Sequence, residues 1–155
     1  MRIAALVLAA GRSTRMGANK LHEVLHEKPL VRHVVDAALA SQISDVLVVT
    51  GHEREKIEAA LTDCDVQFTH NANYADGLST SVKTGLAALP RETDGALILL
   101  GDMPLVSRGV IDQLVNAITL SPNHFAAVPT LVYGLVLLMC ALAYFILQSV
   151  IINKF

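Results

Sequence analysis

Cysteine is scarce in this chain of 155 residues, where only Cys64 and Cys140 occur. The two lie in segments of different character and lack the close spacing of metal ligands. The sequence therefore argues against a disulfide framework and against a cysteine-based metal site. An excess of one charge is also missing, because 12 Lys and Arg residues against 14 Asp and Glu residues leave a net charge of −2. Nothing in this balance favours nucleic acid as a partner.

A secretory signal is not expected either. The apolar run at residues 3–10 is short and ends in a charged loop, which does not suit a cleavage site. Together with the scarcity of cysteine, this predicts that the amino-terminal part works in the reducing cytoplasm.

A loop rich in glycine, hydroxyl groups and positive charge follows the first apolar run. Residues 8–20 read Leu-Ala-Ala-Gly-Arg-Ser-Thr-Arg-Met-Gly-Ala-Asn-Lys. Backbone N–H groups in such a loop can hold a phosphate, and its cationic side chains can neutralise it. Gly11 and Gly17 allow a tight bend and a close approach to a ligand. Their spacing fits neither G-x-x-x-x-G-K-[ST] nor G-x-G-x-x-G.

Two later segments add candidate site residues. Residues 71–86 predict a helix that begins at Asp76 or Gly77, with three hydroxyl side chains in its first turn; plain helix capping is the alternative interpretation. The apolar run 96–100 predicts a central strand and ends in Gly-Asp-Met-Pro. A carboxylate at the carboxyl end of such a strand, here Asp102, faces the crevice of an open α/β sheet and suits Mg²⁺.

Residues 22–26 match the zinc-protease pattern H-E-x-x-H. That pattern needs both histidines on one face of a sustained helix. Pro29 follows three residues later and disfavours helix before it, so we expect an extended or turn segment instead.

Alternating strand and helix patterns run from residue 2 to about residue 120 and predict an α/β fold with a mostly parallel sheet. Loops at the carboxyl ends of the first strand and of the 96–100 strand are then expected to meet at one crevice. The expected strands are 2–9, 45–51, 66–69 and 96–100, and the expected helices are 30–39, 53–61, 78–89 and 107–119.

The pattern L-A-A-G-x-S-x-R-M-G-x-x-K, with N-x-x-Y-x-x-G-L-x-x-S and G-D-M-P, resembles the MobA-like nucleotidyltransferases over residues 1–129. The resemblance implies a three-layer α/β/α, Rossmann-like fold of the nucleotide-diphospho-sugar transferase type. It implies transfer of a nucleoside monophosphate from an NTP to a phosphorylated acceptor such as molybdopterin, with release of pyrophosphate. The A-A-G opening favours CTP over GTP.

The same resemblance assigns residue roles. Arg15, Lys20 and Asp102 are the expected catalytic residues, and Asp102 is the expected ligand of Mg²⁺. The expected nucleotide-binding residues are Leu8, Ala9, Ala10, Gly11, Arg12, Ser13, Thr14, Arg15, Gly17, Lys20, Asn73, Gly77, Leu78 and Ser79.

The family pattern ends after residue 129, and residues 131–152 carry no charge. Twenty-two uncharged, mostly apolar residues are long enough to span a bilayer, so we expect a truncated transferase domain followed by an apolar transmembrane helix that tethers it to the inner face of the membrane. A fusion or frameshift product is an alternative origin. The alternative functions are an inactive nucleotide-binding domain on a membrane anchor, a sugar- or alditol-phosphate nucleotidyltransferase, and an interaction or channel subunit that works through residues 131–152.

Overall fold

The computed structural model describes residues 1–11 and 24–120 of the chain. The chain divides into two compact units, Met1–Ala117 and Ile118–Phe155, and the fold described below is that of the first unit. Its elements are, in chain order, β1 (Ile3–Ala9), β2 (Val24–Leu25), β3 (Lys28–Pro29), α1 (Leu30–Leu39), β4 (Asp45–Thr50), α2 (Arg54–Ala60), β5 (Gln67–His70), the 3₁₀ turn η3 (Tyr74–Asp76), α3 (Leu78–Ala88), β6 (Gly95–Leu100) and α4 (Arg108–Leu120).

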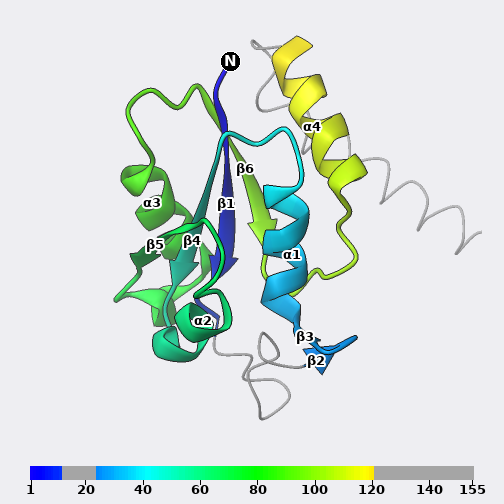
Figure 1. Ribbon diagram of the computed structural model, residues 1–155. Coiled ribbons are helices and arrows are strands. Elements are labelled where there is room, and N and C mark those ends of the chain that lie inside the picture. The colour runs from blue at the N-terminus through cyan, green and yellow to red at the C-terminus, as the bar shows by residue number, and fades with distance from the viewer. Residues whose placement is uncertain (12–23, 121–155) are drawn as a thin grey trace, which may run out of the picture. The chain divides into compact units, whose positions relative to one another are not determined.

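Four strands form one parallel sheet in the order β5-β4-β1-β6. Every residue of β1 is buried, as its unbroken apolar sequence predicts for a strand covered on both faces. Helices α1 and α3 cover opposite faces of this sheet (Figure 1). The fold class predicted from the sequence, α/β with a mostly parallel sheet, is confirmed.

On the α3 side of the sheet the core is built from alternate residues of two strands. Leu6 and Leu8 of β1 pack with Leu47 and Val49 of β4, and three side chains close the cluster from outside: Val82, Leu89 and Leu100. The helices begin and end within one or two residues of their expected bounds, because their apolar positions recur at helical spacing.

Among the described residues, the strand predicted at 96–100, β6, pairs with β1 alone and so does not take the central position predicted for it. β6 lies at one edge of the sheet that the described residues form, and Ile98 on its α3 side is 45% exposed. The central strand is β1, with β4 on one side and β6 on the other. Apolar composition alone does not separate the two positions, because pairing is decided by contacts distant in sequence.

The segment with the zinc-protease pattern forms a hairpin at its carboxyl end. β2 and β3 pair antiparallel, Val24 with Pro29, and the two loop residues His26 and Glu27 have φ of 49° and 66°. Two positive φ values are typical of a type I′ turn. A helix therefore does not run through residues 24–29, in agreement with the expected extended or turn segment; His22 and Glu23 lie outside the described residues.

The side chain of His33 in α1 is partly buried against the hairpin. Its Nε2–H donates to the carbonyl of Leu25 at 2.7 Å and ties the hairpin to α1. An ionic network supports the same contact: Lys28 of β3 and Arg32 of α1 both donate to Asp36 at 2.8 Å, and Arg32 also binds Asp63. The hairpin, which directly follows residues 12–23, is thus fixed to the sheet through α1.

Stability is expected to fall in acid through Asp36. Partial burial raises the pKa of this carboxyl, but the hydrogen bonds from Lys28 and Arg32 outweigh burial and hold the pKa below its usual value. A lowered folded-state pKa stabilises the protein above the unfolded value of about 3.9 and stops doing so as the pH falls through the folded value. Urea titrations should therefore show Asp36→Asn less stable than the wild type at pH 7, with the difference shrinking below about pH 4. A difference that stays constant from pH 7 to pH 3 would contradict this assignment.

Candidate active site

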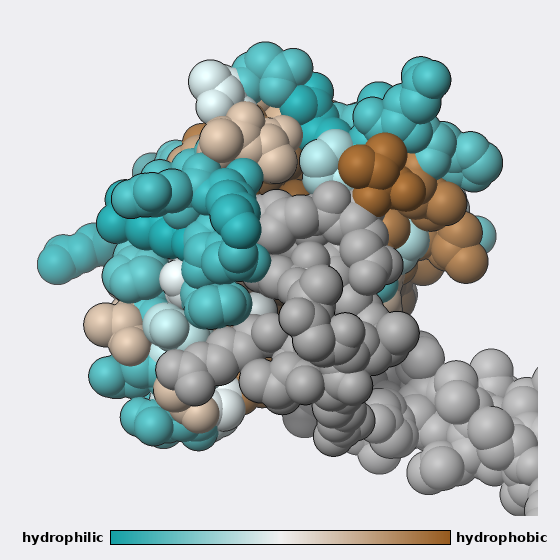
Figure 2. All heavy atoms as spheres, turned by 90° about the horizontal axis from the view of Figure 1, so that it is seen from below, coloured by the Kyte–Doolittle hydropathy of each residue, from teal (hydrophilic) through white to brown (hydrophobic). Residues whose placement is uncertain are grey.

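The carboxyl ends of all four parallel strands meet at one edge of the sheet. The backbone shows it directly: the N–H of Gly101 donates to the carbonyl of Leu8 at 3.0 Å, and the N–H of Asn71 donates to the carbonyl of Thr50 at 2.8 Å. The turn at Ala10–Gly11 leaves β1 at this edge. Figure 2 views the molecule from this side; hydrophilic residues make up most of the described surface that is visible, and apolar residues gather at its upper right.

The order of the strands places a switch point beside β1. Along the chain the sheet grows from β1 to β4 and β5 on one side, and then returns to place β6 on the other side of β1. Ligands of open α/β sheets bind outside the carboxyl ends of the strands at such a point. The turn at Ala10–Gly11 and the turn at Gly101–Asp102 leave the two strands that flank it. The two loops therefore begin at neighbouring strand ends on the same edge of the sheet, and the expectation that they form one crevice stays a prediction.

Asp102 is exposed in the turn directly after β6. Its carboxylate makes no hydrogen bond or ion pair with any residue in the described part of the chain. An available carboxylate at this edge fits Mg²⁺, which takes few protein oxygens and several from phosphate and water. Within residues 1–11 and 24–120, no group of three or more His, Cys, Asp or Glu side chains could hold a metal by itself.

The first loop is described only at its start. Leu8, Ala9 and Ala10 have buried side chains, so a ligand could meet only their backbone, whereas Gly11 is exposed with nothing within 4 Å of the position of a Cβ. The other predicted loop residues lie outside the described residues, and their roles stay predictions: Arg12, Ser13, Thr14, Arg15, Gly17 and Lys20.

The second predicted segment is held at the same edge, after β5. Asn73, Gly77, Leu78 and Ser79 are all exposed there, Leu78 to 61%. Gly77 precedes α3 with φ 112°, and no side chain caps the helix by a hydrogen bond, so the capping residue is Gly77 and not Asp76. The exposed backbone of this helix start faces the solvent at the candidate site's edge of the sheet.

Two residues without an assigned role organise this edge. Asn71 is 2% exposed, and its amide donates to Thr80 Oγ1 at 2.8 Å and to Ser81 Oγ at 2.9 Å, while its Oδ1 accepts from the N–H of Asn73 at 2.9 Å. Gly51, at the end of β4, lies in close contact with Ala10. The sequence signal for both is weak: Gly51 is the last residue of the strand expected at 45–51, and Asn71 is the first residue of the pattern N-x-x-Y-x-x-G-L-x-x-S.

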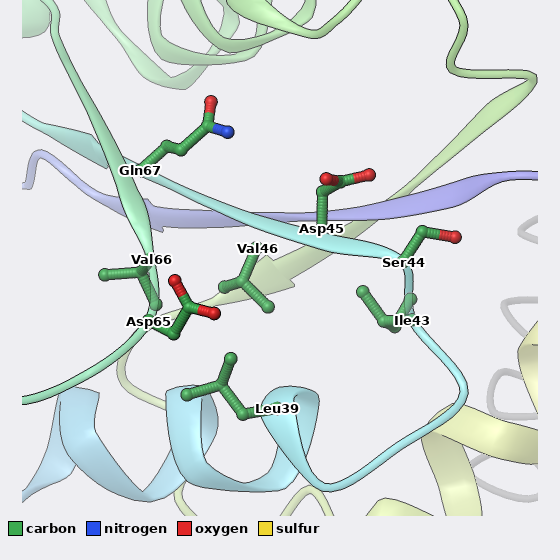
Figure 3. A pocket seen from close by; sticks show the side chains of 8 residues that line it. All are labelled: Leu39, Ile43, Ser44, Asp45, Val46, Asp65, Val66 and Gln67. Atoms are coloured by element: carbon green, nitrogen blue, oxygen red, sulfur yellow. The ribbon is translucent and has the colours of Figure 1, made fainter.

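A pocket of about 260 Å³ lies at the opposite, amino-terminal edge of the sheet (Figure 3). Its polar lining includes Asp45 and Asp65, and Asp45 already accepts two hydrogen bonds from Arg2 at 2.9 and 3.1 Å. The pocket lies at the ends of β4 and β5 that are remote from Ala10 and Asp102. It therefore forms no part of the candidate site.

A parallel α/β sheet with a switch point beside its first loop belongs to the class of open α/β folds that bind ligands outside the carboxyl ends of their strands. Residues 5–147 match the model of the MobA-like NTP transferase domain, and the chain belongs to that family. The match extends past residue 129, where the motif-based resemblance ends, and covers most of the apolar segment 131–152.

Relatives and solved structures agree with this membership. The bifunctional protein GlmU of Francisella philomiragia is 38% identical over 120 residues, which cover 76% of this chain and 26% of the relative. A nucleotidyl transferase from Methanothermobacter thermautotroptrophicus is 31% identical, with a TM-score of 0.68 over 74% of this chain and 57% of that one. CMP:2-keto-3-deoxy-manno-octonic acid synthetase, solved with CTP, has a TM-score of 0.68 at 19% identity over 79% of this chain and 49% of that one, and supports the fold. The chain thus spans about a quarter of the length of its curated relatives.

Within the described residues, no helix is both long and apolar enough to cross a membrane. The predicted transmembrane helix at 131–152 lies outside the described residues and stays a prediction.

Proposed function

We propose that this chain is the NTP-binding part of a nucleotidyltransferase that transfers a nucleoside monophosphate, CMP in preference, to a small phosphorylated acceptor such as molybdopterin. One observation carries the proposal: a glycine-containing turn and an available carboxylate, Ala10–Gly11 and Asp102, leave the two neighbouring parallel strands that flank the switch point. Cationic and amide groups on one loop and a metal ligand on the other suit a triphosphate bound between them.

In the proposed reaction, a phosphate oxygen of the acceptor attacks the α-phosphorus of the NTP. A new P–O bond forms, and the bond from the α-phosphorus to the bridging oxygen breaks, so that its electron pair leaves with pyrophosphate. The backbone N–H groups at Gly11 to Thr14 and the side chains of Arg15 and Lys20 would hold the phosphates. Preorganised positive charge of this kind stabilises the transition state without a protein nucleophile.

Asp102 would hold Mg²⁺, which when bound supplies charge neutralisation to the phosphate oxygens. Asn73, Gly77, Leu78 and Ser79, which the structure places on the exposed face of one segment, would contact the nucleoside. The preference for CTP rests on the A-A-G opening of the loop, and the structural neighbour solved with CTP is compatible with it.

The proposal is tested by ligand binding and by product release with the purified chain. A ligand at 100 times its Kd stabilises the folded state by about 2.7 kcal/mol, and the stabilisation is smaller when the Kd is higher. At equal concentrations, CTP with Mg²⁺ should therefore raise the melting temperature more than GTP with Mg²⁺ does. Pyrophosphate should then appear when molybdopterin is added. Release with a sugar or alditol phosphate alone would favour the related sugar-phosphate transferases. Binding without release for any acceptor would favour a non-catalytic nucleotide-binding domain, and no stabilisation by any NTP would contradict the proposal.

A further inference from the structure

Gly51 stands where three segments of the candidate site come together. It is buried at the carboxyl end of β4, between the start of the first loop and the 3₁₀ turn η3. A Cβ built on Gly51 would lie 2.7 Å from the Cβ of Ala10, 2.7 Å from the Cβ of Tyr74 and 2.9 Å from the carbonyl oxygen of Ala10. All three contacted atoms belong to the backbone or sit directly on it, so none can move away by a rotamer change. The space at Gly51, rather than its backbone conformation, is what requires glycine.

Backbone hydrogen bonds connect the residues next to Gly51 to the first loop and to the second segment. The N–H of His52, the next residue, donates to the carbonyl of Ala10 at 3.3 Å, which holds β4 to the first loop. The N–H of Asn71 donates to the carbonyl of Thr50 at 2.8 Å, which holds β4 to the second segment. The rings of His52 and Tyr74 add a tilted contact at 6.0 Å between centroids. The two loops are thus held through β4, on either side of Gly51.

Hydrogen bonds of Asn71 and Thr80 connect the residues of the second segment, 71–81, to one another. The buried amide of Asn71 joins Thr80 and Ser81 of α3, and its oxygen accepts from the N–H of Asn73. The hydroxyl of Thr80 lies within hydrogen-bond distance of the carbonyls of Asn73 and Gly77, at 2.9 and 2.8 Å. A displacement imposed at Tyr74 is therefore carried to the exposed residues at 73–79.

We infer that Gly51 is a positioning residue for the nucleoside triphosphate: its missing side chain sets the spacing between the phosphate turn at Ala10–Gly11 and the nucleoside-facing segment at 73–79. This inference rests on the proposed function. A ligand that touches both segments binds best at one separation of the two, so a side chain at position 51 weakens NTP binding in addition to lowering stability.

The test compares Gly51→Ala with Gly85→Ala in the full chain. Gly85 is a matched control, because it is also buried and its added Cβ would overlap Leu6 Cδ1, inside the core and not at the carboxyl edge. Both variants are expected to lower the melting temperature. Only Gly51→Ala should raise the Kd for CTP with Mg²⁺, about tenfold or more, and should raise KM more than it lowers kcat.

A second variant adds the methyl group at position 51 and removes the methyl group of Ala10, which it would contact. Ala10→Gly/Gly51→Ala removes one of the 2.7 Å contacts while keeping the new side chain, so it should recover part of the lost affinity. If Gly51→Ala alone does not fold, this double variant is compared with Gly85→Ala, and the same order of affinities is expected.

The outcomes separate the two proposals. If the wild type binds CTP and Gly51→Ala binds it equally well, the inference about Gly51 is overturned and the proposed function stands. Equal losses of affinity in Gly51→Ala and Gly85→Ala would also overturn it, since the effect would then follow stability alone. A wild type that binds no NTP overturns the proposed function and this inference together.

Discussion

Asp102→Asn is expected to lower the rate of pyrophosphate release by about 100-fold or more, because a metal clamp on a reacting phosphate contributes several kcal/mol and each 1.4 kcal/mol is a factor of ten. The substitution removes the negative charge that suits Mg²⁺ and keeps the size of the side chain. Since Asp102 is exposed and makes no hydrogen bond or ion pair within the described residues, the fold should be unaffected. Steady-state assays at several Mg²⁺ concentrations, with circular dichroism spectra of each variant, measure both effects.

Asp65→Asn is the matched control for this experiment. Asp65 is another exposed aspartate, but it lines the pocket at the amino-terminal edge of the sheet, remote from Ala10 and Gly101. Its replacement should leave pyrophosphate release within about twofold of the wild type, as for an ordinary surface substitution. Equal activity of Asp102→Asn and the wild type at every Mg²⁺ concentration would refute the role assigned to Asp102.

Leu6→Ala is expected to destabilise the first unit by about 3 to 5 kcal/mol. Leu6 is fully buried at the centre of the cluster between β1, β4 and α3, so its loss leaves a cavity that the surrounding strands cannot close. Gly85→Ala should also destabilise, by about 1 to 3 kcal/mol, because its Cβ would overlap the end of the Leu6 side chain.

The two substitutions should not add. The three atoms nearest to the new Cβ are Cγ, Cδ1 and Cδ2 of Leu6, and all of them are absent from an alanine. In the Leu6→Ala background, Gly85→Ala should therefore stabilise, since it partly fills the cavity and gains about 1 kcal/mol of helix propensity. Urea unfolding followed by circular dichroism suits this cycle, because the chain contains no tryptophan. Additive free energies would show that the packing of α3 on β1 differs from the one described.

Local sequence patterns were enough to predict most of the helices and strands. The helix expected at 30–39 is α1, Leu30–Leu39, because Val31, Val34, Val35 and Ala38 recur at the spacing of one buried face. The extended or turn segment ahead of it followed from Pro29, which disfavours helix in the preceding residues; the pairing of β2 with β3 was not predicted. Such signals act over a few residues, so they are legible in the sequence itself.

Relations between distant residues were not predictable in the same way. The apolar run at 96–100 suits a central strand and an edge strand equally, and only pairing with β1 placed it. Nothing near His33 indicates that its ring binds the carbonyl of Leu25. The close contacts of Gly51 and the hydrogen bonds of Asn71 were not predictable, because the atoms that they contact belong to other segments of the chain.

The amino-acid sequence by itself determined the alternation of strands and helices, which follows from the spacing of apolar residues along the chain. Its motifs resemble those of the family, and that resemblance supplied the candidate residues for phosphate, nucleoside and metal, whose roles stay predictions. Only the tertiary structure decided that β1 lies between β4 and β6, and that the turns at Ala10–Gly11 and at Asp102 follow neighbouring strands at one edge. It also decided that Gly51 lies between Ala10 and Tyr74, where there is no room for a Cβ atom. The physical reason is that strand order and close backbone contact depend on the packing of segments distant in sequence, which no local pattern encodes.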